Sequence, residues 1–194
     1  MDSKIIDQKL NLLEYLKQET ESDHRLAEKN NTAKYILDHT ITSDQYISLL
    51  LNNYMIYNGI ESYLVNNKHL AHQNLVEFIS KEKSDLLKFD LESHGCEVNN
   101  NNPLNTFLKP SPESIVGALY VLEGSMLGGL VIGKNLNKCQ NLTAFKEHYF
   151  YNQDTTYCLS RWKHFCESVK ACNYDYKDFA NISQAASAVF RRFH

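Results

Sequence analysis

A histidine and a lysine near the start of the chain have a spacing that could place both against one ligand. His24 follows Lys17 by seven residues, with Thr20 between them. In a helix, seven residues make two turns, about 10.5 Å along the axis and on nearly the same face. A neutral imidazole binds metals well, and a lysine ammonium can pair with an anionic group of the same ligand. A lone histidine is more often a surface or core residue, so the pair alone decides nothing.

The second feature is a cluster of glycines in an apolar segment. Five of the seven glycines lie between residues 117 and 133, and the only acid between them is Glu123. Each glycine in a helix costs about 1 kcal/mol relative to alanine, so something must offset the lost helix propensity. Close approach of another backbone or a flat ligand, which side chains would block, is the usual reason.

Three interpretations of this glycine segment compete. It is nearly long enough to span a membrane, and the pairs Gly124/Gly128 and Gly129/Gly133 have the spacing of membrane helix dimers. Glu123 near its centre opposes that interpretation. Tight packing against another helix in a protein core is favoured by the residues alone. A bent helix laid over a flat cofactor is the third, because the glycines from Gly124 to Gly129 exceed what helix packing needs and allow a kink.

The elements that must position these residues are predicted to be helices. No hairpin signal and no long strand alternation occurs, so we expect one all-α bundle over residues 1–194. Thr42 and Gln45 form a capping box, and Ser111 before Pro112 is a strong helix start. A polar loop is expected near 93–111. The helical segments expected are 4–29, 32–39, 42–64, 72–91, 112–133, 142–150, 152–170 and 176–193.

Composition narrows the class of protein. The net charge of −3 gives no reason to expect nucleic acid or an anionic membrane as a partner. The first residues lack the apolar stretch of a signal peptide. The five cysteines are an odd number without a CxxC pair, which fits reduced thiols in a cytoplasmic protein.

The two features together suit a porphyrin. Such a ligand carries a central metal, which an imidazole can bind, and carboxylates at one edge, which a lysine can meet. His24 and Lys17 have the matching separation, and the glycine helix could form the opposite wall.

At these residues the chain resembles the heme oxygenases, over nearly its whole length. Leu16-Lys17, Thr20, His24 and Ala27-Glu28 are similar to the family's proximal-helix signature. The segment from Tyr120 to Gly129 is similar to the distal helix of the bacterial branch, with Glu-Gly-Ser followed by glycines.

The resemblance implies a role for each matching residue. His24 would be the axial iron ligand, Lys17 a propionate partner, and Thr20 a neighbour on the same face. The distal contact surface would be Gly124, Ser125, Gly128 and Gly129. Tyr120 would reach a propionate, and Trp162, Lys163 and Phe190 match haem-edge positions less closely.

One departure from the animal-type pattern concerns the water beside bound oxygen. Animal-type members have an aspartate directly after the first distal glycine, where this chain has Ser125. The bacterial branch often has serine there too. The Ser125 hydroxyl, or water held by carbonyls near Gly124, would take over.

The implied activity is oxidative cleavage of haem to biliverdin, with O2 as co-substrate and release of CO and ferrous iron. A histidine ligand suits this chemistry, because a thiolate would favour O–O cleavage. No GxGxxG follows a strand, so electrons would come from an external ferredoxin, flavodoxin or reductase. The product would serve iron acquisition or a bilin-using partner, and both stay open.

Two alternatives share the scaffold. One is a catalytically silent haem-binding protein, with Ser125 as its mark. The other is a same-fold enzyme acting on another small molecule, such as a thiamin-salvage hydrolase. The latter needs a nucleophilic cysteine near a carboxylate, and none of the five cysteines lies in such a motif.

Overall fold

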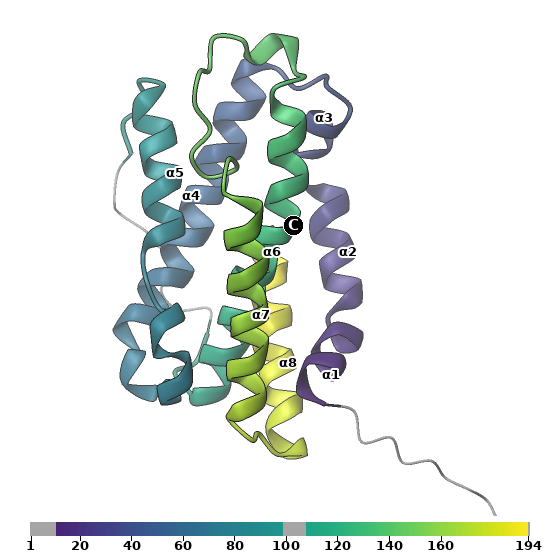
Figure 1. Cartoon of the computed structure of the whole chain (residues 1–194), viewed down its shortest axis with the longest axis vertical. Helices are drawn as coiled ribbons and strands as arrows, with labels where there is room; N and C mark the ends of the chain where they lie inside the picture. Colours follow the sequence, from purple (N-terminus) through teal and green to yellow (C-terminus); the bar gives the residue numbers. More distant parts are fainter. Residues whose placement is uncertain (1–10, 99–107, 194) are drawn as a thin grey trace, which may run out of the picture.

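A computed structural model of the chain describes residues 11–98 and 108–193, and shows a bundle of helices (Figure 1). These described residues contain no strand. The α-helices are α1 (Leu12–Glu19), α2 (Glu21–Asn30), α3 (Lys34–Leu37), α4 (Ser43–Asn66), α5 (Glu82–Ser93), α6 (Pro112–Leu136), α7 (Thr155–Ala171) and α8 (Tyr176–Phe190). Short 3-10 helices are η1 (Lys68–Leu70), η2 (Gln73–Phe78), η3 (Gln140–Leu142) and η4 (Arg191–Phe193). The predicted all-α bundle is confirmed.

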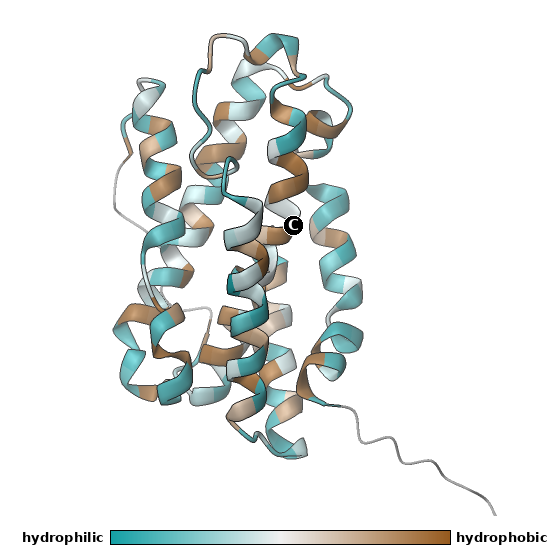
Figure 2. Ribbon diagram, in the orientation of Figure 1, coloured by the Kyte–Doolittle hydropathy of each residue, from teal (hydrophilic) through white to brown (hydrophobic). Residues whose placement is uncertain are grey.

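The glycine-rich helix α6 is the centre of the bundle. It packs most extensively on α8 and also contacts α7, α3 and α4. Apolar residues recur along α6, whereas α2 at the side of the bundle is mostly hydrophilic (Figure 2). By length and composition α6 could cross a membrane, but 44% of its most apolar window is buried inside the protein. Its hydrogen-bonded run is unbroken from Pro112 to Leu136, so the kink stays a prediction.

Local signals fix the starts of two long helices as predicted. The Thr42 side chain accepts from the Gln45 amide, and the Gln45 side chain accepts from the Thr42 amide, which completes the capping box of α4. Ser111 caps α6 through the Ser114 amide, with Pro112 as the first helical residue. These caps determine the residues at which α4 and α6 begin.

Three predicted helices differ from those in the structure. The segment 4–29 is two helices that meet at Thr20, and its residues 4–10 lie outside the described part. The Thr20 hydroxyl donates to the Leu16 carbonyl at 2.7 Å, a local bond that competes with helix continuation. Lys17 and His24 are therefore on different helices. The segment 72–91 divides into η2 and α5.

The third difference is the predicted helix 142–150. Apart from its first residue, which ends η3, it belongs to an irregular connection over residues 143–154. Much of the loop predicted near 93–111 lies outside the described residues.

Two of the α6 glycines allow a neighbouring backbone to touch the helix. A Cβ on Gly117 would lie 2.6 Å from the Ile182 carbonyl oxygen of α8, and one on Gly133 would lie 2.2 Å from the Tyr151 carbonyl oxygen. Real Cβ atoms essentially never come this close to backbone. The packing interpretation is therefore correct for these two positions.

Replacing Gly117 with alanine should destabilise the protein. The new methyl group must push α8 away from α6, and overpacking of this kind costs about 1–3 kcal/mol, more than alanine returns in helix propensity. Urea unfolding of Gly117→Ala measures the change. An unchanged or raised midpoint would contradict the packing assigned to Gly117.

Candidate functional site

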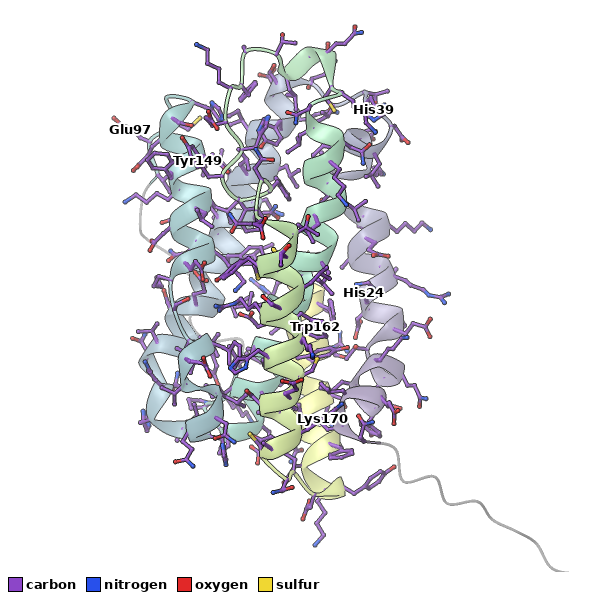
Figure 3. The ribbon with its side chains drawn as sticks, viewed as in Figure 1. His24, His39, Glu97, Tyr149, Trp162 and Lys170 are labelled. Atoms are coloured by element: carbon purple, nitrogen blue, oxygen red, sulfur yellow. The ribbon has the colours of Figure 1, made fainter. Side chains whose placement is uncertain are left out.

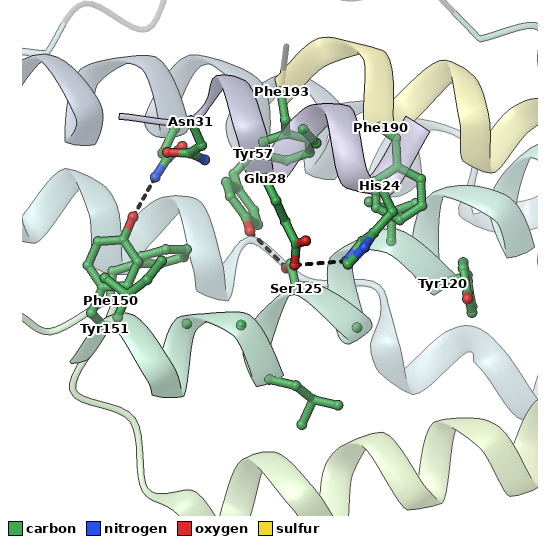
Figure 4. Close-up of a pocket in the computed structure, with 18 of the residues that line it drawn as sticks. His24, Glu28, Asn31, Tyr57, Tyr120, Ser125, Phe150, Tyr151, Phe190 and Phe193 are labelled. Atoms are coloured by element: carbon green, nitrogen blue, oxygen red, sulfur yellow. Dashed lines mark hydrogen bonds and ion pairs between the residues drawn. The ribbon is translucent and has the colours of Figure 1, made fainter. Parts of the chain in front are cut away.

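A cavity of about 280 Å³ opens between α2 and the second half of α6 (Figure 4). The residues around it come from six parts of the chain. They are His24, Ala27, Glu28 and Asn31 of α2 and its end, Asn53 and Tyr57 of α4, Tyr120, Val121, Gly124, Ser125, Leu127, Gly128, Gly129 and Ile132 of α6, Phe150 and Tyr151, Trp162 of α7, and Phe190 and Phe193 at the C-terminal end. Figure 3 labels His24 on α2 and Trp162 on α7, which both line this cavity.

His24 offers an accessible imidazole to the cavity. Its side chain is 52% exposed, and Nε2 lies 3.8 Å from the Glu28 carboxylate one turn along α2. The ring stands edge-to-face on Phe190, with centroids 5.2 Å apart. The phenyl group therefore limits how far the imidazole can turn, and Nε2 is held near the open space.

Part of the opposite wall is helix backbone without side chains, at three glycines of α6. A Cβ on Gly128 would meet nothing within 4 Å, and one on Gly129 would only touch Tyr151 at 3.9 Å. At Gly124 a Cβ would rest 3.5 Å from the Trp162 ring, an ordinary contact. Neighbouring protein backbone does not require glycine at these three positions, in contrast to Gly117 and Gly133.

A hydroxyl pair stands beside the bare backbone. The Tyr57 hydroxyl donates to Ser125 Oγ at 2.8 Å, and Ser125 Oγ donates to the Leu122 carbonyl at 2.7 Å. Burial raises the pKa of Tyr57, partly opposed by the bond to Ser125, so the phenol stays protonated at neutral pH. The cavity wall here is uncharged but able to hydrogen bond.

The comparisons with known proteins agree with this geometry. The sequence model of the heme oxygenase family matches residues 10–194. The chain belongs to the heme oxygenase family. No curated protein matches it.

Two solved bacterial structures share the fold. The heme oxygenase of Leptospira interrogans has a TM-score of 0.72 at 18% identity, covering 95% of this chain and 97% of its own. The heme oxygenase of Neisseria meningitidis, solved with NO and CO bound, has a TM-score of 0.68 at 19% identity, covering 95% of this chain and 88% of its own. At such identities the structures establish the fold.

The structure brings together most of the site residues predicted from the resemblance to heme oxygenases. Residues that line the cavity are His24, Tyr120, Gly124, Ser125, Gly128, Gly129 and Phe190. Thr20 is buried and does not line it, but its side chain lies beside Tyr120. Burial raises the pKa of Tyr120, and the Thr20 hydroxyl opposes this shift.

Two predicted residues do not line the cavity. Lys17 is exposed at the end of α1. Lys163 is 79% exposed and lies 3.9 Å from Glu167, one turn along α7. Both ammonium groups are therefore solvated, and their roles at a propionate stay predictions.

Phe150 and Tyr151 form a side wall of the cavity that was not predicted from the sequence. The Asp90 carboxylate of α5 accepts from the Tyr149 amide at 2.7 Å and from the Phe150 amide at 2.9 Å. Asn53 Nδ2 donates to the Tyr151 hydroxyl at 2.8 Å. These bonds hold an irregular segment against the cavity from α5 and α4. No local pattern signals them, because the partners are 59 and more residues away.

The site fits a ligand that brings its own metal. Among the described residues no group of three His, Cys, Asp or Glu side chains could hold an ion. A single imidazole facing a bare helix suits a flat group whose metal already has ring donors, as haem iron has. His24 would supply the axial nitrogen, and Gly124, Gly128 and Gly129 would lie against the ring.

Replacing Gly128 with alanine should have opposite effects on stability and binding. The methyl group meets no protein atom, so the ligand-free protein should gain up to about 1 kcal/mol of helix propensity. It would stand in the space expected for the haem face, so hemin affinity should fall about tenfold or more. Urea unfolding and hemin titration measure the two effects. Unchanged hemin affinity would show that haem does not lie on Gly128.

Asp90 gives the site a testable pH dependence. Burial raises the pKa of Asp90 to about 6, although two amides donate to it. Its unfolded pKa is about 3.9, so between pH 6 and 4 the folded chain binds this proton first and Asp90 contributes more stability as the pH falls. Relative to Asp90→Asn, the wild type should therefore gain about 2 kcal/mol between pH 7 and 4.5 in urea unfolding. A relative loss would show that the amide bonds outweigh burial.

Proposed function

We propose that this chain is an active heme oxygenase that opens haem to biliverdin, releasing CO and ferrous iron. The observation that carries the proposal is the imidazole of His24 across one cavity from the uncovered backbone of Gly124 to Gly129. Bound haem supplies the iron at which O2 is activated, and its ring is also the carbon skeleton that is cleaved.

On the proximal side, the chain must present a neutral imidazole. Nε2 of His24 must leave the neighbourhood of Glu28 to bind the iron, since one nitrogen cannot serve both. Phe190 holds the ring upright, which limits the rearrangement to a small rotation. Tyr120, supported by Thr20, and Lys17 at the end of α1 would meet the propionates.

On the distal side, the chain supplies close backbone and hydroxyl groups. The described part of α6 that lines the cavity carries no charged side chain, so it holds no strong acid to pull an O–O bond apart. Tyr57 and Ser125 can hold ordered water and pass a proton along it. Because the glycines carry no side chains, the haem ring could lie close to α6. The α6 backbone would then leave only a narrow space between itself and the ring.

Electrons would come from outside the chain, through a ferredoxin, flavodoxin or reductase. The five cysteines are all free, as expected of a cytoplasmic protein. A bilin-using partner or the iron supply of the cell would take the products.

The second candidate is haem binding without turnover. Ser125 favours it, because no carboxylate stands on the α6 wall to organise the distal water. The two functions differ in what happens to bound haem under reducing conditions with oxygen.

Hemin titration followed by turnover tests the proposal. The wild type should shift the Soret band, and a reductant with O2 should convert it to the spectrum of biliverdin. His24→Ala should lose the axial-ligand spectrum, whereas His69→Ala on the exposed η1 should behave as the wild type. A Soret band that persists through reduction and oxygenation would support the non-catalytic candidate. No Soret shift would overturn both.

A further inference from the structure

The acid that precedes the distal glycines is fully buried on the side of α6 away from the cavity. The Glu123 side chain is 0% exposed and does not line the cavity. Its Oε1 accepts from Lys83 Nζ at 2.8 Å. Its two oxygens also accept from the guanidinium of Arg161, at 2.6 Å from Nε and 3.1 Å from Nη2. One carboxylate thus joins α6 to α5 and to α7.

The two cations are themselves held in place. Lys83 is 5% exposed and lies in the first turn of α5, where the buried Glu61 carboxylate accepts from the Lys83 and Ser84 amides at 3.0 and 2.9 Å. Arg161 also lies 3.7 Å from Glu82. Neither cation can follow Glu123 freely if α6 turns.

Stability alone does not account for this cluster. Taking three charges out of water costs free energy that well-packed apolar side chains of the same volume would not cost. Such a cluster does fix the orientation of the Glu123 side chain, because bidentate arginine–carboxylate bonds tolerate little rotation. The rotation of α6 matters because Gly124, Gly128 and Gly129 on its cavity side carry no side chains that could interlock with neighbouring elements.

Because a helix is stiff, fixing the direction of Glu123 also fixes how far the α6 glycines lie from the cavity. Successive residues differ by about 100° around the axis, so fixing Glu123 toward α5 and α7 fixes Gly124 and Ser125 relative to the cavity. A rotation of about 20° would move the backbone, at its radius of about 2.3 Å, by about 0.8 Å. Displacements of about 1 Å are enough to impair positioning for a reaction.

We propose that Glu123 is a positioning residue that, through Lys83 and Arg161, sets the rotation of α6 and thereby the distance and tilt of its glycine face over the haem. The proposal rests on the proposed function for its consequence, but the rotation of α6 is a property of the ligand-free protein as well.

The ligand-free test uses the only tryptophan of the chain. Trp162 of α7 packs against Gly124, so its fluorescence reports how α6 faces α7. Glu123→Gln removes the charge at nearly the same volume, and it should shift the Trp162 emission and increase its quenching by acrylamide. Leu64→Ala, at a buried position of α4 outside the cavity, is the control for lost core packing. It removes no hydrogen bond or ion pair of Glu123, Lys83 or Arg161, and it should leave the emission unchanged.

The haem-loaded test measures the C–O stretching band of CO on ferrous haem. This band depends on the groups directly above the iron. Glu123→Gln should shift or split the band, and Arg161→Lys, which keeps the charge but loses the two-pronged contact, should cause a smaller shift. Leu64→Ala should keep the wild-type band. A loss of stability without a change in position would leave all bands the same.

The outcomes separate this proposal from the proposed function. Wild-type emission and a wild-type CO band in Glu123→Gln would overturn the positioning role, even if the protein makes biliverdin. A wild type that binds no hemin would overturn the proposed function, and Trp162 emission would still decide whether Glu123 sets the rotation of α6. If Glu123→Gln does not fold, both measurements are made on Arg161→Lys. Wild-type emission and a wild-type CO band in that variant would overturn the positioning role.

Discussion

The structure depends on one constraint: α6 must be bare where a flat ligand can lie on it, yet be held firmly from its other sides. Glycine meets the first demand at Gly124, Gly128 and Gly129, where no neighbouring backbone requires it. The second demand is met by close backbone contact at Gly117 and Gly133 and by the buried ions around Glu123. The glycines of one helix thus serve two different purposes.

The remaining walls of the cavity are fixed from outside it. Phe190 supports the imidazole of His24, and Thr20, where α1 and α2 meet, lies beside Tyr120 of α6. Asp90 holds the irregular segment that carries Phe150. Each support comes from a different part of the bundle, so several elements together fix the shape of the cavity.

The sequence predicted those features that depend on interactions between residues close together in the chain. The caps of α4 and α6 are examples, since each bond joins residues three apart. The break at Thr20 was not predicted because the apolar spacing continues through it. The structure shows the break in the non-helical backbone of Thr20, whose hydroxyl bonds to the Leu16 carbonyl. Residues 143–154 were missed because Asp90 lies far away in sequence. From the sequence, Glu123 served only as an argument against a membrane helix. Its ion pairs with Lys83 and Arg161 could not be predicted, because these residues lie on other helices.

A crystal structure of the hemin complex tests the central claim most directly, because it shows both faces of the ring at once. The account predicts iron bound by Nε2 of His24 and the opposite face of the ring against the backbone of Gly124 and Gly128. It also predicts that Glu123 keeps its contacts with Lys83 and Arg161. Iron bound by another residue, or a ring that lies away from the α6 glycines, would contradict it.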